Sequence, residues 1–246
     1  MRRQIPARNS QARLRLLVKE IGEKGGLLLA LTLLSAATAN SAVVTGRVQI
    51  TGRRGAPAPV AVVYAEPLDG VSSPQAGKTY SMAQRKKAFV PNILVVPAGS
   101  TVNFPNEDLI FHNVFSLSQP APFDLGLYRA GVSKARTFAS PGTYRIFCNI
   151  HPEMTAVILV VPTSYIAQTD AQGNYQINLP AGRYRLTARS PESQPTSVEI
   201  EVSSAGARLA GLNLDESQAV EEPHKNKFGQ DYPKGSYDPI KGRTKN

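Results

Sequence analysis

The feature that most constrains the fold is a set of four side chains, of types that can bind metals, from two separate parts of the chain. His112 stands alone, whereas Cys148, His151 and Met154 follow one another with two residues between each pair. Cys148 ends an alternating run that is typical of a β-strand, and Met154 precedes the apolar run of a further strand. A fold that uses all four side chains together must therefore bring His112 beside the loop between these two strands.

The chemistry of these four residues indicates the kind of site that they would form. One cysteine thiolate, two histidine imidazoles and one methionine thioether are the ligands of a mononuclear type 1, or blue, copper site. Zinc is the main competing metal, but zinc sites rarely use a thioether, so Met154 favours copper. Each residue alone is more easily explained as an ordinary core or surface residue. Only their joint spacing favours a metal site.

The N-terminus has the features of an export signal. Basic residues precede a short apolar run at residues 25–34, and small residues follow, ending in Ala37-Thr38-Ala39. This order is typical of a secretory signal peptide with its cleavage site. Because a bilayer span needs about 20 apolar residues, the short run favours cleavage over an uncleaved membrane anchor. We therefore expect residues 1–39 to be removed, which leaves a periplasmic or otherwise exported protein without a stable membrane span.

Export makes the single cysteine informative. Exported proteins usually hold cysteines in pairs as disulfides, so an unpaired cysteine serves another chain, a metal ion or a chemical reaction. Cys148 is the only cysteine in the chain. Metal binding would account for it, since coordination deprotonates the sulfur and occupies it.

Charge and motifs exclude several classes of function. The formal net charge is +10, and the basic residues of the predicted signal supply about half of it. The remaining positive charge favours an acidic protein partner. The sequence has no dense basic stripe and no nucleic-acid-binding motif, which argues against a nucleic-acid partner. It also has no Ser-His-Asp order, phosphate-binding glycine loop or acid pair, so we do not expect an enzyme.

Short β-strands dominate the expected secondary structure. Apolar or alternating runs bounded by Gly, Pro and Ser predict strands at residues 43–50, 60–64, 93–96, 101–104, 112–117, 143–148 and 156–161. Residues 118–135 are expected to be irregular, and no amphipathic helix is predicted after the signal. This pattern predicts an all-β protein, built as a sandwich or a barrel.

Residues 79–162 contain four short motifs: Phe104-Pro105-Asn106, Phe111-His112-Asn113-Val114, Pro141-Gly142-Thr143-Tyr144 and a Cys-x2-His-x2-Met loop. With these motifs the stretch resembles a cupredoxin, and the last motif is similar to the short ligand loop of amicyanins. The resemblance implies a Greek-key β-sandwich in which the four residues named above bind one type 1 copper ion, with Met154 as the axial ligand. It also implies that Asn113 joins the two ligand-bearing segments through hydrogen bonds.

Segments on both sides of that stretch carry three further motifs. Residues 169–175 have the pattern T-D-x-x-G-x-Y, residues 179–186 have the pattern L-P-x-G-x-Y-x-L, and a Gly-x-Val lies at residues 46–48. These segments resemble a carboxypeptidase regulatory-like, or transthyretin-like, β-sandwich. We therefore expect a discontinuous sandwich of residues 42–68 and 163–215, with the cupredoxin inserted between them. This arrangement resembles exported bacterial proteins labelled methylamine-utilisation or plastocyanin-like.

Two further polar residues are of interest outside the ligand set. Asp124 is expected to cap a turn, with a role in orienting a ligand as the alternative. Residues 216–246 contain few apolar residues and are predicted to form a disordered polar tail. The third histidine, His224, lies in this tail and is expected to be solvated.

These features predict an exported copper protein that carries single electrons between redox protein partners. One alternative is a periplasmic copper-carrying or storage protein without a role in electron transfer. A more distant one is a structural adhesion-type β protein with a vestigial copper site. For the electron route, we expect His112 to be the buried imidazole, shielded by its apolar sequence neighbours Phe111, Val114 and Phe115. The ring edge of His151 is expected to reach the surface and pass the electron.

Overall fold

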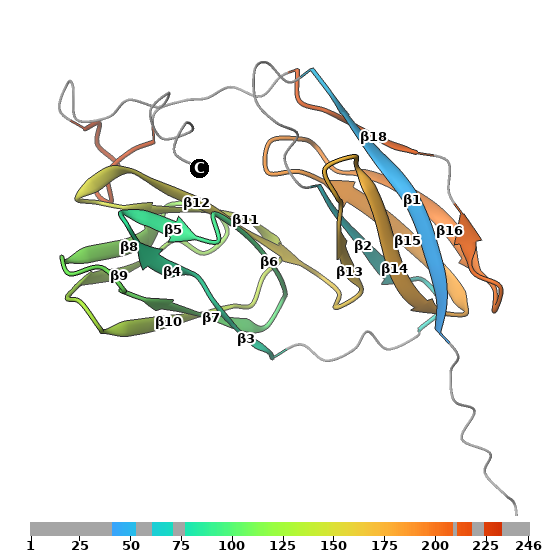
Figure 1. Ribbon diagram of the computed structural model, residues 1–246, viewed down its shortest axis with the longest axis horizontal. Helices are drawn as coiled ribbons and strands as arrows, with labels where there is room; N and C mark the ends of the chain where they lie inside the picture. The colour runs from blue at the N-terminus through green and yellow to red at the C-terminus, as the bar shows by residue number, and fades with distance from the viewer. Residues whose placement is uncertain (1–40, 53–60, 71–76, 209–210, 218–223, 233–246) are drawn as a thin grey trace, which may run out of the picture. The chain divides into compact units, whose positions relative to one another are not determined.

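A computed structural model of the protein describes residues 41–52, 61–70, 77–208, 211–217 and 224–232 (Figure 1). Strands are the only regular secondary structure within these ranges, which confirms the predicted all-β class. No helix there has the length and apolar character needed to cross a membrane. The predicted export signal, residues 1–39, lies outside the described residues.

The strands of the described part of the chain are mostly short. In order they are β1 (Ser41–Thr51), β2 (Val62–Pro67), β3 (Thr79–Ser81), β4 (Ala83–Arg85), β5 (Ala88–Val90), β6 (Ile93–Pro97), β7 (Ser100–Pro105), β8 (His112–Ser116), β9 (Phe123–Tyr128), β10 (Ser133–Phe138), β11 (Gly142–Cys148), β12 (His151–Val161), β13 (Ile166–Gln168), β14 (Asn174–Pro180), β15 (Gly182–Arg189), β16 (Thr196–Val202), β17 (Ala207–Arg208) and β18 (Leu212–Asp215).

The prediction of an irregular segment at residues 118–135 is wrong. This segment contains β9, which pairs with β8, and the start of β10, which pairs with β7. Most positions in both strands are only partly buried or exposed. Their apolar alternation is therefore weak in the sequence, and their strand conformation depends on pairing with neighbours from other parts of the chain.

The segment that resembles a cupredoxin folds into two main sheets. One has the strand order β6-β12-β11-β8-β9, and the other has the order β10-β7-β3. Antiparallel pairing joins β11 to β12 and to β8, whereas β6 runs parallel to β12. Because successive side chains of a strand point to opposite faces, each sheet can present an apolar face to a common core.

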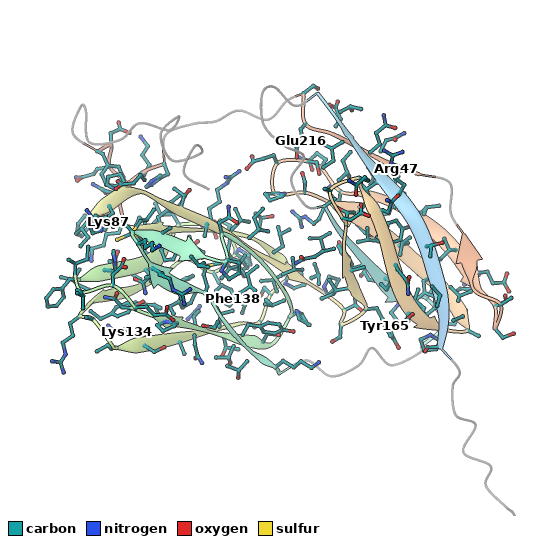
Figure 2. The ribbon with its side chains drawn as sticks, viewed as in Figure 1. Arg47, Lys87, Lys134, Phe138, Tyr165 and Glu216 are labelled. Atoms are coloured by element: carbon teal, nitrogen blue, oxygen red, sulfur yellow. The ribbon has the colours of Figure 1, made fainter. Side chains whose placement is uncertain are left out.

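Aromatic and aliphatic side chains fill the core of this sandwich. Tyr144, Ile146 and Cys148 contribute to it from alternate positions of β11. Phe138 from β10, which is labelled in Figure 2, lies edge-on to Tyr144, and their ring centroids are 5.0 Å apart. Full burial of one large apolar side chain stabilises a fold by about 1.5–3 kcal/mol. This core therefore fixes the strands that carry the candidate ligands.

Strands from both sides of residues 79–162 pair with one another in two further sheets. In one sheet, β1 pairs with β14, β17 and β18 (Figure 1). The other sheet has the order β13-β2-β15-β16. A separate apolar cluster, which includes Val44, Tyr184 and Leu214, joins side chains of both sheets. The assignment of these sheets to a carboxypeptidase regulatory-like domain stays a prediction.

The turn before β14 is fixed by local hydrogen bonds and by a glycine. Asp170 Oδ1 accepts hydrogen bonds from the backbone N–H groups of Gln172, at 2.9 Å, and Asn174, at 2.8 Å. Gly173 has a φ angle of 84°, in the left-handed region that favours glycine. A Cβ atom at this position would also collide with the backbone oxygen of Val48.

Gly173→Ala should therefore destabilise the protein through both backbone strain and collision. We expect the free energy of unfolding to fall by about 2–4 kcal/mol, as measured by chemical denaturation followed by circular dichroism. Gly131→Ala is the matched control, because Gly131 has a φ angle of 76° and no heavy atom within 4 Å of an added Cβ. The control should cost about 1–2 kcal/mol. Equal losses in the two variants would contradict the collision.

Candidate metal centre

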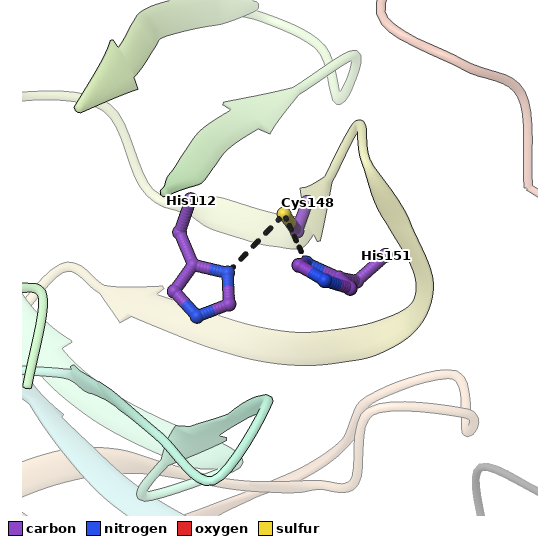
Figure 3. Close-up of side chains that lie close together, drawn as sticks. All are labelled: His112, Cys148 and His151. Carbon is purple, nitrogen blue, oxygen red and sulfur yellow. Dashed lines mark hydrogen bonds between the residues drawn. The ribbon is translucent and has the colours of Figure 1, made fainter. Parts of the chain in front are cut away.

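Three of the candidate ligands converge in the structure (Figure 3). His112 begins β8, Cys148 ends β11 and His151 begins β12. Their potential ligand atoms all lie within 4.8 Å of one another. Cys148 Sγ is 3.8 Å from His112 Nδ1 and 3.7 Å from His151 Nδ1. The two imidazole rings are tilted by 58°, with centroids 4.9 Å apart.

The two sulfur–nitrogen distances fit a single metal ion. Metal bonds of about 2.3 Å to sulfur and about 2.0 Å to nitrogen, set at trigonal angles, would hold the two atoms about 3.7 Å apart. The observed sulfur–nitrogen distances of 3.7 and 3.8 Å agree with this value. One thiolate and two imidazoles also have the softness that copper prefers.

The connection between β11 and β12 brings Cys148 and His151 together. The two strands are antiparallel, with Cys148 opposite His151 and a turn at Asn149 and Ile150. Residues directly opposite each other in an antiparallel pair have their Cβ atoms about 5 Å apart. The register shifts between Phe147 and Cys148, so the regular ladder is interrupted where the ligand loop begins.

Met154 is almost fully buried, in the same core cluster as Cys148. Burial alternates along this part of β12, where Met154, Ala156 and Ile158 are the buried positions and Thr155 is exposed. Met154 therefore belongs to the side of β12 that faces the core and the cysteine. Its role as an axial ligand stays a prediction.

A carboxylate that the sequence analysis did not single out orients His112. His112 is fully buried, and its Nε2 lies 2.8 Å from Asp108 Oδ2. With its proton on Nε2, the ring presents an unprotonated Nδ1 toward Cys148, as metal binding requires. Burial by itself raises the pKa of Asp108, but hydrogen bonds from two backbone N–H groups and the His112 ring lower it below its ordinary value. The charged carboxylate is thus the favoured partner of the ring.

Asp108 also holds a strained turn beside the site. Lys86 and Lys87 join β4 to β5 with φ angles of 53° and 56°, in a region that lysine rarely adopts. Asp108 Oδ1 accepts the N–H of Lys86 at 2.5 Å, and Oδ2 accepts the N–H of Lys87 at 2.8 Å. One carboxylate therefore restrains both the candidate ligand His112 and this turn. Lys87, in the turn, is labelled in Figure 2.

Asn113 links β8 to the ligand loop. Its backbone N–H lies 3.5 Å from Cys148 Sγ, and its side-chain oxygen accepts a hydrogen bond from Asn149 N at 3.3 Å. Its side-chain amide donates to Asp124 Oδ1 at 2.6 Å. The same oxygen of Asp124 accepts the N–H of Gly126 at 2.8 Å. Asp124 therefore caps a turn and also orients Asn113.

The sulfur of Cys148 is buried among hydrogen-bond donors. Burial raises the pKa of the Cys148 thiol, while the backbone N–H groups of Asn113, Ile150 and His151 act in the opposite direction. A bound metal cation favours the thiolate strongly. The donors around the sulfur therefore suit a thiolate that binds a metal.

The two candidate histidine ligands differ in exposure. His112, Val114 and Phe115 are fully buried, whereas His151 is half-buried. Phe111 does not shield His112 as expected, because it lies in the loop before β8 and is 54% exposed. Burial, followed by the nearby His112, lowers the pKa of His151. The neutral ring that this favours is the form that binds metals.

Most of the predicted disordered tail, residues 216–246, lies outside the described residues, so its disorder stays a prediction, but its described parts make defined contacts. Glu216 is buried, and residues 224–232 contact the ligand loop. The ring of His224, which was expected to be solvated, stacks on Phe147. These contacts use one ring and a few polar groups, which the composition of the segment does not reveal.

The chain is similar in sequence to amicyanin-alpha of Methylorubrum extorquens strain AM1. The two are 29% identical over 103 residues, which make up 41% of this chain and 86% of amicyanin-alpha. No known family model matches the chain.

Solved structures that are similar to part of the chain include the following three. A copper-containing nitrite reductase from Thermus scotoductus SA-01 is 27% identical, with a TM-score of 0.33 over 39% of this chain and 25% of the reductase. A purple cupredoxin from Nitrosopumilus maritimus is 21% identical, with a TM-score of 0.32 over 33% of this chain and 99% of its own. A mutant of amicyanin in the Cu(I) form is 20% identical, with a TM-score of 0.32 over 37% of this chain and 97% of its own. The sequence similarity to amicyanin-alpha supports a cupredoxin domain in this chain.

Proposed function

We propose that the protein is an exported mononuclear type 1 copper protein that carries single electrons between redox protein partners. The observation that carries this proposal is the approach of two histidine nitrogens to Cys148 Sγ, at 3.7 and 3.8 Å. The similarity to amicyanin-alpha supports the same function. Export is inferred from the sequence of residues 1–39.

Four side chains would hold the ion. His112, Cys148 and His151 are the proposed strong ligands, and Met154 is the proposed weak axial ligand. Copper bound there supplies reversible one-electron chemistry. The chain contributes restraint, because the core immobilises Cys148 and Met154 while Asp108 holds the ring of His112. Restrained ligands rearrange little when an electron is gained or lost, which favours fast transfer.

We propose that electrons pass through the edge of His151, which is the more exposed of the two histidines. Sequence neighbours of the ligands add exposed apolar surface, since Ile150 is 47% exposed, Ile110 40% and Phe111 54%. Transient redox encounters use small contact areas. The exposed apolar side chain of Ile150, directly before His151 in the sequence, suits a contact of this kind.

Ile150→Glu should slow electron exchange because it places a negative charge in this contact. We expect the self-exchange rate between Cu(I) and Cu(II) copies, measured by NMR line broadening, to fall about tenfold. The visible spectrum should be unchanged, because the ligands are untouched. Val198→Glu is the control, since Val198 is 40% exposed on β16, which belongs to a different sheet from the strands that carry the candidate ligands. Equal rates in the two variants would rule out the contact at Ile150.

Voltammetry of the copper-loaded protein distinguishes the proposal from its alternative. An electron carrier should give a reversible one-electron wave and keep its copper through repeated cycles. A copper-carrying or storage protein without an electron-transfer role should lose its copper or cycle irreversibly. A structural β protein with a vestigial site should bind no copper under the same conditions.

We also propose that residues 42–68 and 163–215 form one discontinuous sandwich of the carboxypeptidase regulatory-like type, with the copper domain of residues 79–162 inserted. The pairing of β1 with β14 and of β2 with β15 supports this organisation. Insertion of a domain is tolerated when its two ends lie close together at an exposed loop.

A further inference from the structure

The side chain of His224 contacts Phe147 and Pro152, the residues on either side of the loop from Cys148 to His151. Its ring stacks on Phe147, which precedes Cys148, with centroids 3.9 Å apart and planes inclined by 15°. Its Nε2 lies 2.7 Å from the carbonyl oxygen of Pro152, which follows His151. One side chain from a distant segment therefore spans the loop from its beginning to its end.

A compact turn next to His224 presents a second contact. Asn226 Oδ1 accepts hydrogen bonds from the N–H groups of Phe228, at 2.9 Å, and Gln230, at 3.0 Å. This arrangement holds the backbone N–H of Lys227 at 3.0 Å from Asn149 Oδ1. Asn149 is the first residue of the turn between Cys148 and His151. The segment of residues 224–232 therefore also contacts the middle of this loop.

The ammonium group of Lys227 is connected to Cys148 through the hydrogen bonds of Asp124 and Asn113. Lys227 Nζ donates to Asp124 Oδ2 at 2.8 Å, and the other oxygen of Asp124 accepts the Asn113 side-chain amide at 2.6 Å. The backbone N–H of Asn113 faces Cys148 Sγ at 3.5 Å. Burial by itself raises the pKa of Asp124, but the hydrogen bonds from Lys227 and Asn113 lower it overall. The chain of contacts thus runs from the C-terminal segment to the sulfur.

The ion pair at the start of this chain is only partly exposed to water. The side chain of Lys227 is 26% exposed and that of Asp124 is 37% exposed. A second pair in the same segment, between Lys225 and Asp231, has side chains that are 50% and 81% exposed. Exposed pairs contribute little to stability because water screens them. Lys225 therefore offers a matched comparison for Lys227.

We propose that residues 224–232 form a clasp that positions the loop from Cys148 to His151. In this clasp, Lys227 is a positioning residue that acts on the cysteine through Asp124 and Asn113. Any role of the clasp in electron transfer rests on the proposed copper function. Its effect on the position of the loop does not depend on that function. The clasp restrains the loop from a part of the chain outside the sandwich strands and limits access of solvent to the sulfur.

The accessibility of Cys148 in the metal-free, full-length protein tests the clasp directly. Cys148 is fully buried and is the only cysteine, so alkylation by iodoacetamide reports on this site alone. His224→Ala and Lys227→Met should each raise the alkylation rate about tenfold by making local opening easier. Lys227→Arg, which keeps the charge, and Lys225→Met should react at the wild-type rate.

A thermal unfolding curve of each variant separates loop opening from loss of the fold. Unchanged unfolding midpoints with faster alkylation support the clasp. Wild-type alkylation rates in both His224→Ala and Lys227→Met would overturn it. Faster alkylation that follows a lowered midpoint would also overturn it, since the residues would then act on stability alone.

The copper-loaded protein provides the test of Lys227 as a positioning residue. Lys227→Met should shift the thiolate-to-copper absorption band and the copper hyperfine splitting, and Lys227→Arg should restore both. Faster alkylation with an unchanged spectrum would overturn this role of Lys227. If wild-type protein shows no copper–thiolate band, the proposed function fails, while the alkylation of metal-free protein still decides whether the clasp exists.

Discussion

Copper-loaded Cys148→Ser protein should lack the intense visible absorption that we expect of the wild type. That absorption requires a bond between a cysteine sulfur and copper, and Cys148 is the only cysteine in the chain. Serine is close in size, so the sandwich should still fold, with a loss of about 1–3 kcal/mol for burying a hydroxyl group. Absorption after addition of one equivalent of Cu(II) measures the band, and circular dichroism checks the fold.

Met82→Leu is the matched control for this substitution. Met82 is fully buried in the same core cluster as Cys148 but is not a candidate ligand. Exchange of these two apolar residues should cost less than about 1.5 kcal/mol and should leave the band intact. An intense band in folded Cys148→Ser protein would mean that copper binds elsewhere.

Asp108→Ala should weaken both copper binding and the fold. The substitution removes the acceptor of His112 Nε2, and loss of such a partner typically lowers metal affinity about 10- to 100-fold. It also removes the acceptor of two backbone N–H groups in the strained turn of Lys86 and Lys87. We expect the free energy of unfolding to fall by about 2–4 kcal/mol. Competitive copper titration and chemical denaturation measure the two effects.

A change in the turn separates the two roles of Asp108. The double substitution Lys86→Gly and Lys87→Gly relieves the strain of the positive φ angles and leaves His112 unchanged. In that double-glycine background, Asp108→Ala should cost less stability than it does in the wild type. The loss of copper affinity should remain. If affinity is unchanged in both backgrounds, Asp108 anchors the turn and does not act on His112.

The fold class could be predicted because several strands carry their signal in the sequence. The alternation of Tyr144, Ile146 and Cys148 reflects one buried face of β11, and the apolar run at residues 156–161 reflects the buried part of β12. β9 and β10 were missed because most of their positions are partly buried or exposed. Their conformation comes from pairing with distant strands, which a local pattern does not record.

At the candidate metal centre, too, local sequence patterns could be recognised, whereas contacts between distant segments could not. The ligand candidates could be found because their residue types and spacing are unusual. Asp108 could not be found, because its contact with His112 depends on the path of the loop before β8. The contacts of His224 and Lys227 with the ligand loop join residues more than 70 positions apart. The composition of residues 216–246 predicts disorder because these contacts use one stacked ring and a few polar groups. Contacts of this kind require no apolar pattern that could be recognised in the sequence.

Titration of the metal-free wild-type protein with Cu(II), followed by visible absorption, tests the central claim most directly. Binding through Cys148, His112 and His151 should produce an intense thiolate-to-copper band that grows linearly and saturates at one copper ion per chain. The basis for that expectation is that one potential ligand atom from each of these three residues lies within 4.8 Å of the others. Weak absorption without a thiolate band, or saturation at a different stoichiometry, would contradict a mononuclear type 1 copper site.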